Sequence, residues 1–287
     1  MTKRLADVSA RIEGIRQLGQ VVNAMRGIAS ARAQQARGQL AAVESYASTI
    51  ALAIGRVIAL APSAVQDGAR RPTRPALVLF CAEQGFAGAF SERALDAVGG
   101  ELAASVLFLV GSRGRAIAAE RGVEVDWTSA APAQSLGVSR LADRIAEAVY
   151  ARIGVGDIDR LDAVFSQWRP GEPVRIVRRR LFPFDMHAFA LPVHGVTPLC
   201  NLPPEDLLRD LTAEYMHAQL CDAALHAFAA ENEARVEAMA SAHREIDRQL
   251  ASLKATQRQV RQEDITAEII ELAAGETASR KIGRSRR

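Results

Sequence analysis

Proline is absent from residues 2–60, and both proline and glycine are absent from residues 205–274. These two residue types are the strongest helix breakers, so their absence predicts a long helix at each end of the chain. Roughly 70 uninterrupted helical residues at ~1.5 Å each would form a rod of about 105 Å. A rod of that length cannot bury one face against a small domain and needs a partner of similar length.

Cysteine is scarce, and aromatic residues make up only 5% of the chain. The three cysteines, Cys81, Cys200 and Cys221, are widely spaced, which excludes a disulfide framework and predicts free thiols in a reducing compartment. The five histidines show no metal-ligand spacing, and no serine, cysteine and histidine arrangement suggests a nucleophile. We therefore expect no metal, no cofactor, no catalytic residue and no enzymatic activity in the chain itself.

Long hydrophobic runs and strong charge are also missing. Residues 50–62 are the most hydrophobic stretch, but Arg56 interrupts them and they are too short to span a bilayer. Lys3, Arg4 and Asp7 near the start argue against a signal peptide. The formal net charge of +3 suits an acidic protein partner, and the basic residues do not form the single stripe that would indicate nucleic-acid binding.

Apolar residues recur at spacings of three and four in both terminal segments, which predicts a coiled coil. We expect residues 1–60 and 204–276 to pair as antiparallel helices. The predicted N-terminal seam is Leu5, Val8, Ile12, Ile15, Leu18, Val22 and Met25, continued by Ala29, Ala36, Leu40 and Val43. The C-terminal seam is Leu225, Ala229, Asn232, Val236, Met239, His243, Ile246, Leu250, Leu253, Gln257 and Val260, and it then slips to Ile265, Ile269 and Leu272. The polar members are typical of residues that fix register.

The central part of the chain has a different pattern. A polar linker at 61–75 precedes short apolar runs that alternate with a helical segment, which predicts an inserted Rossmann-like α/β domain over 76–203. A basic tail follows at 277–287. The predicted strands are PALVLF, ASVLFLVG, LDAVFSQW and PVRIVRRRLFPF, and the predicted helix is SRLADRIAEAVYARI. The arginine run at 178–180 is interpreted as a solvated or partner-facing edge rather than a nucleic-acid site.

The stretch FCAEQGFAGAF, residues 80–90, lies where a nucleotide-binding fold keeps its phosphate loop. A Walker loop requires Lys-Ser/Thr after its second glycine, but Gly88 is followed by Ala89 and Phe90. A Rossmann fingerprint requires three glycines, and only Gly85 and Gly88 are present. The pattern favours a tight turn between a strand and a helix over a nucleotide site.

Motifs in three parts of the chain match one family. At the N-terminus the motif is IEGIRQLGQVVNAMRGIASAR. The matching residues elsewhere are Glu83, Gly85, Gly88 and Phe90 in the loop, then Glu214, Tyr215, Leu220, Glu231, Ala234, Arg235, Ala238 and Met239, and finally Arg261, Gln262, Ile265, Thr266, Glu268, Ile269, Glu271 and Gly275. Through these residues, which cover nearly the whole chain in order, the chain resembles the gamma subunit of F-type ATP synthases.

The resemblance implies a non-catalytic rotor shaft, or central stalk, that couples ion flow to ATP synthesis or hydrolysis. Its partners would be the alpha and beta subunits, the epsilon subunit and the membrane rotor ring of c subunits, at the cytoplasmic face of the inner membrane. It implies no direct binding of nucleotide or nucleic acid. The contact residues implied are Arg261, Gln262, Ile265, Thr266, Met25 and Arg32, with Arg26 and Arg37 also facing acidic beta-subunit elements and a bearing at Ala273, Ala274 and Gly275.

The sequence also departs from the family. Gln20 and Asn23 stand where the family has lysines, Gln257-Arg258 replaces its Tyr-Asn, and the tail from Ser279 is longer and more basic. These departures indicate a divergent member, of the kind a second, specialised ATPase would use. The alternative is a stand-alone coiled-coil scaffold with an α/β domain, and co-purification with alpha and beta subunits would distinguish the two.

Overall fold

The computed structural model describes residues 3–60, 74–189 and 199–284, with side chains described from residue 4 to residue 274. The predicted linker therefore lies outside the described residues except for its last two positions. Two compact units are present: one combines residues 1–27 with 238–287, and the other contains residues 28–237. The division of the sequence into five segments remains a prediction.

Two long helices begin and end the described chain, α1 (Lys3–Leu60) and α5 (Pro204–Arg284). In the first unit their seams meet in a cluster of buried Val22, Met239 and Ile246, to which Ile15, Met25 and Leu250 add partly buried side chains. Arg4 pairs with Glu263 at 3.1 Å, and Gln257 donates to the hydroxyl of Ser9 at 2.9 Å. Residues near the start of α1 contact residues near the end of α5, which confirms the predicted antiparallel pairing.

The N-terminal seam differs from the prediction at one point. Leu18 is 52% exposed, and its neighbour Gly19 is buried instead. A Cβ added at Gly19 would lie 3.3 Å from Cγ2 of Ile246, so the missing side chain lets the two helices approach closely. The periodicity pointed to leucine as the buried residue, whereas close packing at this crossing requires the smallest one.

The second unit pairs the remaining halves of both helices. Ala29, Ala33 and Ala36 are almost fully buried on α1, the Tyr46 hydroxyl donates to Glu214 at 2.9 Å, and Arg37 pairs with Glu233. By length and composition alone, α1 is apolar enough to cross a membrane. Near its end, Ile50, Ile54 and Val57 form a buried cluster with Leu208 of α5 and Phe189.

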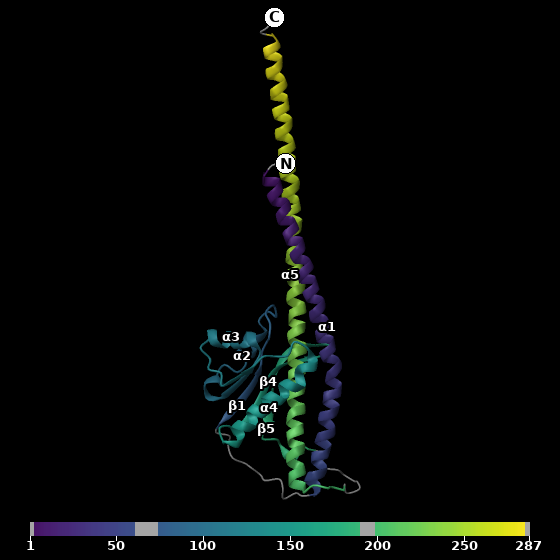
Figure 1. The fold of residues 1–287 in the computed structure, drawn as a ribbon, viewed down its shortest axis with the longest axis vertical. Helices are drawn as coiled ribbons and strands as arrows, with labels where there is room; N and C mark the ends of the chain where they lie inside the picture. The colour runs from purple at the N-terminus through teal and green to yellow at the C-terminus, as the bar shows by residue number, and fades with distance from the viewer. Residues whose placement is uncertain (1–2, 61–73, 190–198, 285–287) are drawn as a thin grey trace. The chain divides into compact units, whose positions relative to one another are not determined.

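The residues between α1 and α5 in sequence form a five-stranded sheet that lies beside α5 (Figure 1). Its strand order is β3-β2-β1-β4-β5. β1, β2, β3 and β4 are parallel neighbours, and β5 joins β4 as an antiparallel edge. The strands are β1 (Pro75–Phe80), β2 (Val106–Val110), β3 (Trp127–Ser129), β4 (Arg160–Arg169) and β5 (Glu172–Phe182). The connecting α-helices are α2 (Phe90–Asp96), α3 (Ser112–Glu120) and α4 (Val138–Gly154), with single 3₁₀ turns at Leu102–Ala104, Ser135–Gly137 and Met186–Ala188.

Helices cover both faces of the sheet, which confirms the predicted α/β insertion. On one face, α2 and α3 pack on β1 and β2 around Leu77, Leu95 and Leu109. On the other face, α4 packs with α1 and α5 around Phe165, Ile145 and Leu220. The short strand β3 was not predicted, because its three residues are not buried and form no apolar run.

The interpretation of residues 178–180 as a solvated edge is confirmed in part, since β5 is an edge strand and Arg178 and Arg180 are exposed, but these arginines also bind carboxylates of the same chain. Arg178 binds Asp162 at 2.7 Å and Glu101 at 2.6 Å, and Arg179 binds Asp222 at 2.6 Å. Burial by itself would raise the pKa of Asp162, but hydrogen bonds from Arg160 and Arg178 hold it below its ordinary value. These arginines therefore neutralise buried carboxylates within the chain.

Candidate functional site

The loop after β1 is a tight structural turn. Phe86 and Gly88 have φ angles of 61° and 57°, a left-handed conformation that glycine adopts without strain and phenylalanine rarely does. Beside the loop, a Cβ on Gly111 would lie 2.5 Å from the carbonyl oxygen of Cys81, so the turn that follows β2 touches the end of β1 directly. A side chain would clash with the end of β1 at Gly111, whereas at Gly88 only the positive φ disfavours one, because nothing lies within 4 Å of the added Cβ.

Glu83 occupies the N-terminus of α3. Its carboxylate accepts hydrogen bonds from the Ser112 amide at 3.0 Å, the Ser112 hydroxyl at 2.7 Å and the Ala131 amide at 2.8 Å. Free amides at a helix N-terminus are the groups that bind phosphate in nucleotide-binding folds. In this chain an internal carboxylate takes that position, and a phosphate placed there would meet negative charge.

Helix α5 contacts the same loop through a buried ion pair. Glu231 and Arg235 are 5% exposed each and pair with each other. Arg235 donates to the carbonyl oxygens of Gln84 and Gly85 at 3.3 Å, and the Gln84 amide donates to Glu231 at 3.5 Å. Burial raises the pKa of Glu231, and Arg235 together with the loop amides opposes that rise.

These contacts lie at the place where a doubly wound sheet binds its ligand, beside a pocket of about 350 Å³ that is lined by the loop and Arg113. The strand order reverses between β1 and β4, and ligands in such folds bind at the carboxyl ends of the strands at that reversal. Here the loop at the end of β1 is held by Glu83 within the domain and by Glu231 and Arg235 from α5. The arrangement is suited to fixing the α/β domain to a helix.

The second candidate region is the end of α5. Residues 265–274 are all exposed, and they include Ile265, Ile269, Ile270 and Leu272 at 50%, 60%, 64% and 75%. Figure 1 shows α5 continuing beyond the start of α1, in the unit where Arg4 pairs with Glu263. Four large apolar side chains on one unpaired helix are a patch that a partner from outside the chain would cover.

The predicted contact residues are found in three places. Arg261, Gln262, Ile265 and Thr266 lie together on exposed α5, where the Thr266 hydroxyl donates to the Gln262 carbonyl at 2.8 Å. Met25 is half-buried in the seam cluster of α1, and Arg32 is half-buried in the other unit. Of the predicted bearing, Ala273 and Ala274 are exposed, and the side chain of Gly275 lies outside the described residues.

The other arginines of α1 make contacts within the chain. Arg37 pairs with Glu233 and lies over the Trp168 ring, 4.0 Å from its centroid. Arg26 donates to the neighbouring Asn23 at 2.9 Å. Arg37 therefore stabilises the α1–α5 pairing and is not available to a partner in the way the sequence suggested.

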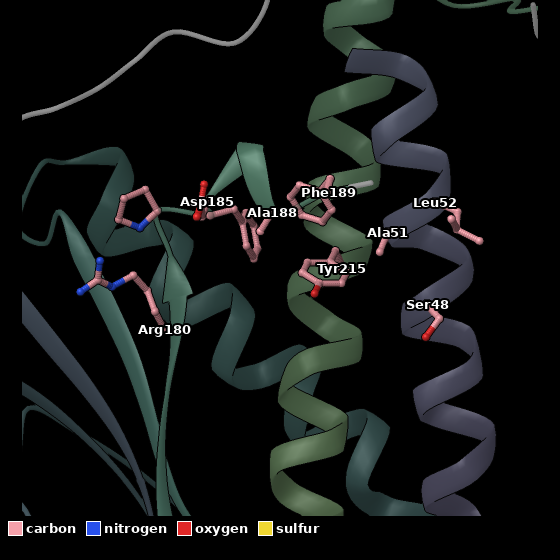
Figure 2. Close-up of a pocket in the computed structure, with 10 residues that line it drawn as sticks. Ser48, Ala51, Leu52, Arg180, Asp185, Ala188, Phe189 and Tyr215 are labelled. Carbon is pink, nitrogen blue, oxygen red and sulfur yellow. The ribbon is translucent and has the colours of Figure 1, made fainter. Parts of the chain in front are cut away.

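A pocket of about 520 Å³ lies near the end of α1 (Figure 2). Tyr215 packs edge-on between Phe184 and Phe189, with ring centroids 5.3 Å apart in both pairs. Arg180 and Asp185 line the side away from α1, and Arg180 lies 3.6 Å from Asp162. Few polar groups converge here, so the pocket does not have the character of a specific small-molecule site.

Sequence reasoning assigned no role to Glu83, Glu231 or Arg235 beyond family likeness. One signal was available for Glu83, since an acidic residue in a strand-to-helix loop opposes phosphate binding. Glu231 and Arg235 stand at i and i+4 beside the predicted seam, a spacing that predicts their pairing with each other but not their burial against the loop.

The sequence matches one protein family over nearly its whole length. The family model described as ATP synthase matches residues 4–278. The ATP synthase gamma chain of Streptomyces griseus is 29% identical, with 97% of both chains covered, and that of Parafrankia sp. is 27% identical, with 97% of this chain and 98% of the relative covered.

Solved structures show the same fold at lower identity. A chain in the Euglena gracilis mitochondrial ATP synthase (OSCP/F1/c-ring) gives a TM-score of 0.66 at 16% identity, covering 96% of this chain and 94% of that one. A chain in the rotor of the same species gives 0.63 at 14% identity, covering 91% and 99%. The full-length matches, the paired terminal helices and the inserted sheet lead to one conclusion: the chain belongs to the ATP synthase gamma-chain family, the non-catalytic central-stalk subunits of the rotary F-type enzyme.

Proposed function

We propose that the exposed end of α5 turns inside a ring of three alpha and three beta subunits. The observation that carries this proposal is the run of exposed residues 265–274 with four large apolar side chains. These apolar side chains can pack against the surrounding alpha and beta subunits without forming hydrogen bonds or ion pairs to them. Such a surface can stay buried while it rotates.

Arg261 and Gln262 act as a polar catch on a beta-subunit loop. Both side chains are exposed, one turn before the apolar run. An arginine that meets an acidic loop forms charge-assisted hydrogen bonds, which are stronger than neutral ones. A contact formed at one rotational angle and broken at the next would let the beta subunits sense the position of the shaft. Thr266 and Ile265 border the catch, and Met25 and Arg32 are proposed as further contacts on α1.

The α/β domain forms the foot of the shaft, against the epsilon subunit and the membrane ring of c subunits. The relatives in solved structures come from assemblies described as rotor and as OSCP/F1/c-ring. The buried clamp of Glu231 and Arg235 would transmit torque from the domain to α5. The complex then lies at the cytoplasmic face of the inner membrane, and the chain binds no nucleotide or nucleic acid itself.

Reconstitution with alpha and beta subunits tests this proposal. The wild-type chain should co-elute with them as one complex that hydrolyses ATP. Leu272→Asp replaces the most exposed of the four large apolar side chains with a charge and should reduce assembly or turnover. Val155→Asp is the matched control, since Val155 is 73% exposed in the α/β domain, outside the proposed bearing. Normal assembly and turnover in Leu272→Asp would contradict the bearing, and failure of the wild-type chain to join the ring would contradict the shaft.

A further inference from the structure

His226 of α5 is a buried polar group that lacks a hydrogen bond. Its side chain is 6% exposed, and the ring stacks on Phe165 with centroids 6.0 Å apart. Its Nδ1 has no hydrogen-bond partner among the described residues, and the same holds for Oδ1 of Asp222. Unsatisfied buried polar atoms on two residues one helical turn apart require an explanation, and a bound ion is one.

Asp222 and His226 stand at i and i+4 on α5 and face each other. The Nε2 atom of His226 lies 3.7 Å from Oδ1 of Asp222. Ligand atoms around a tetrahedral ion with bonds of about 2.0–2.1 Å are ~3.3 Å apart, so a small rotation of either side chain would admit a shared ion. Residues one turn apart on a helix are a frequent source of paired metal ligands.

A third ligand comes from α1. One carboxylate oxygen of Glu44, one of Asp222 and one ring nitrogen of His226 all lie within 4.8 Å of one another. Glu44 is exposed, so its side chain can rotate toward the buried pair and also offers a path of entry. The three ligands would connect α1 to α5 within the unit that contains the sheet. From this geometry we propose that Glu44, Asp222 and His226 form a binding site for a divalent transition-metal ion of the zinc class.

The surrounding groups favour an ion of this class. One imidazole and two carboxylates are ligands that zinc and its neighbours prefer, whereas magnesium and calcium take oxygen ligands. Burial lowers the pKa of His226, although Asp222 opposes this, so the ring is neutral and can bind metal at neutral pH. Arg179 binds Oδ2 of Asp222 at 2.6 Å and leaves Oδ1 for the ion. Its positive charge also limits the affinity of the site.

Sequence patterning could not show this site. The histidines lack a metal-ligand spacing because the third ligand is on α1, far from Asp222 and His226 in sequence. A competing cluster exists on the same helix. His217 pairs with Asp143 at 3.0 Å and lies 3.8 Å from the Cys221 sulfur, but burial raises the pKa of Cys221 to about 12 and keeps it a neutral thiol.

The test uses the full-length chain, stripped of metal and titrated with Zn²⁺ by calorimetry and with Co²⁺ by visible absorption. We expect one ion per chain, a Co²⁺ spectrum without a sulfur charge-transfer band, and a rise in unfolding temperature with Zn²⁺. His226→Gln should weaken binding by at least about 10-fold, which is the loss that even an outer-shell change can cause. Glu44→Gln should do the same, and this exposed variant should fold normally.

His217→Gln is the matched control, since it removes a second aspartate-paired histidine from α5 and should leave binding unchanged. Absence of saturable binding would overturn the proposal. So would binding that survives His226→Gln and Glu44→Gln, or that depends on His217 and shows a sulfur charge-transfer band. A catalytic assay of the assembled enzyme is not needed for any of these outcomes.

Discussion

Glu231 and Arg235 lie one turn apart on α5, and together they bind the amide of Gln84 and the carbonyl oxygens of Gln84 and Gly85. This buried pair attaches the loop of the α/β domain to the helix, in addition to the shared core around Phe165 and Leu220. In most folds of this type the same loop serves a ligand. In this chain the loop connects the α/β domain to α5.

Replacement of Arg235 should therefore lower the stability of the fold. Arg235→Met leaves the Glu231 carboxylate buried without its cation, and we expect the free energy of unfolding to fall by about 3–5 kcal/mol. Arg209→Met is the control on the same helix, since Arg209 is exposed and pairs with Asp206, and it should cost about 0–1 kcal/mol. Chemical denaturation measures both. Equal small losses would show that the clamp does not hold the domain.

Substitutions at two glycines of α1, Gly14 and Gly19, should have opposite effects on stability, because the two positions differ in their contacts. Nothing lies within 4 Å of a Cβ placed on Gly14, whereas one on Gly19 meets Ile246 at 3.3 Å. Gly14→Ala should stabilise the chain by about 0.5–1 kcal/mol, because alanine has the higher helix propensity. Gly19→Leu should destabilise it by about 1–3 kcal/mol through overpacking. Thermal unfolding distinguishes the two, and a neutral Gly19→Leu would mean that the helices do not cross closely there.

Stability should fall on mild acidification because of His226. Burial lowers its pKa below the ordinary 6.5, so below that pH the unfolded state binds a proton that the folded state does not. The free energy of unfolding therefore decreases as the pH falls through 6.5 toward the folded-state pKa. Denaturation across this range should be measured with chelator present. The charged groups that act on the ring are Asp222, Arg179, Glu44 and Arg169.

His226→Gln should flatten this pH dependence, since glutamine does not titrate. His243→Gln provides the comparison, because His243 is 36% exposed and its nearest carboxylate, on Asp247, is 4.0 Å away. A wild-type curve that does not change between neutral and mildly acidic pH would show that His226 is not held neutral by burial.

Arg261→Ala should affect turnover and not assembly. Arg261 is exposed on α5, so the isolated chain should keep its stability within about 0.5 kcal/mol. In the reconstituted complex the loss of charge-assisted hydrogen bonds, each worth roughly 1.5–3 kcal/mol, should lower the ATPase rate. Deletion from Ser279 onward is the contrast and should matter less. Full turnover in Arg261→Ala with loss on deletion would show coupling through the tail instead.

The strands and helices could be predicted because local sequence patterns specify them. Every predicted strand and the predicted helix formed, because each combines an apolar run or period with a turn signal at its ends. The seam from Met239 to Val260 was predictable, since apolar residues at heptad spacing lie along a single stripe of the helix surface.

The remaining features depend on tertiary contacts. Gly19 replaces Leu18 in the seam because of how closely Ile246 approaches. The sequence placed the arginines at 178–180 on an edge of the sheet, but it could not show that Asp162 and Asp222 are buried beside them. The roles of Glu83 and Arg235 likewise depend on loops and helices that meet only after folding.

Rotation itself is the most direct test of the central claim. Cys200 is exposed, whereas Cys81 and Cys221 are buried and burial raises the pKa of each to about 12, so a thiol-reactive probe should label Cys200. The labelled chain is assembled with surface-fixed alpha and beta subunits and observed by single-molecule microscopy as ATP is added. We predict unidirectional rotation of the probe with three pauses per turn, one for each beta subunit. A probe that stays fixed while the same complexes hydrolyse ATP would contradict the assignment of this chain as the rotating shaft.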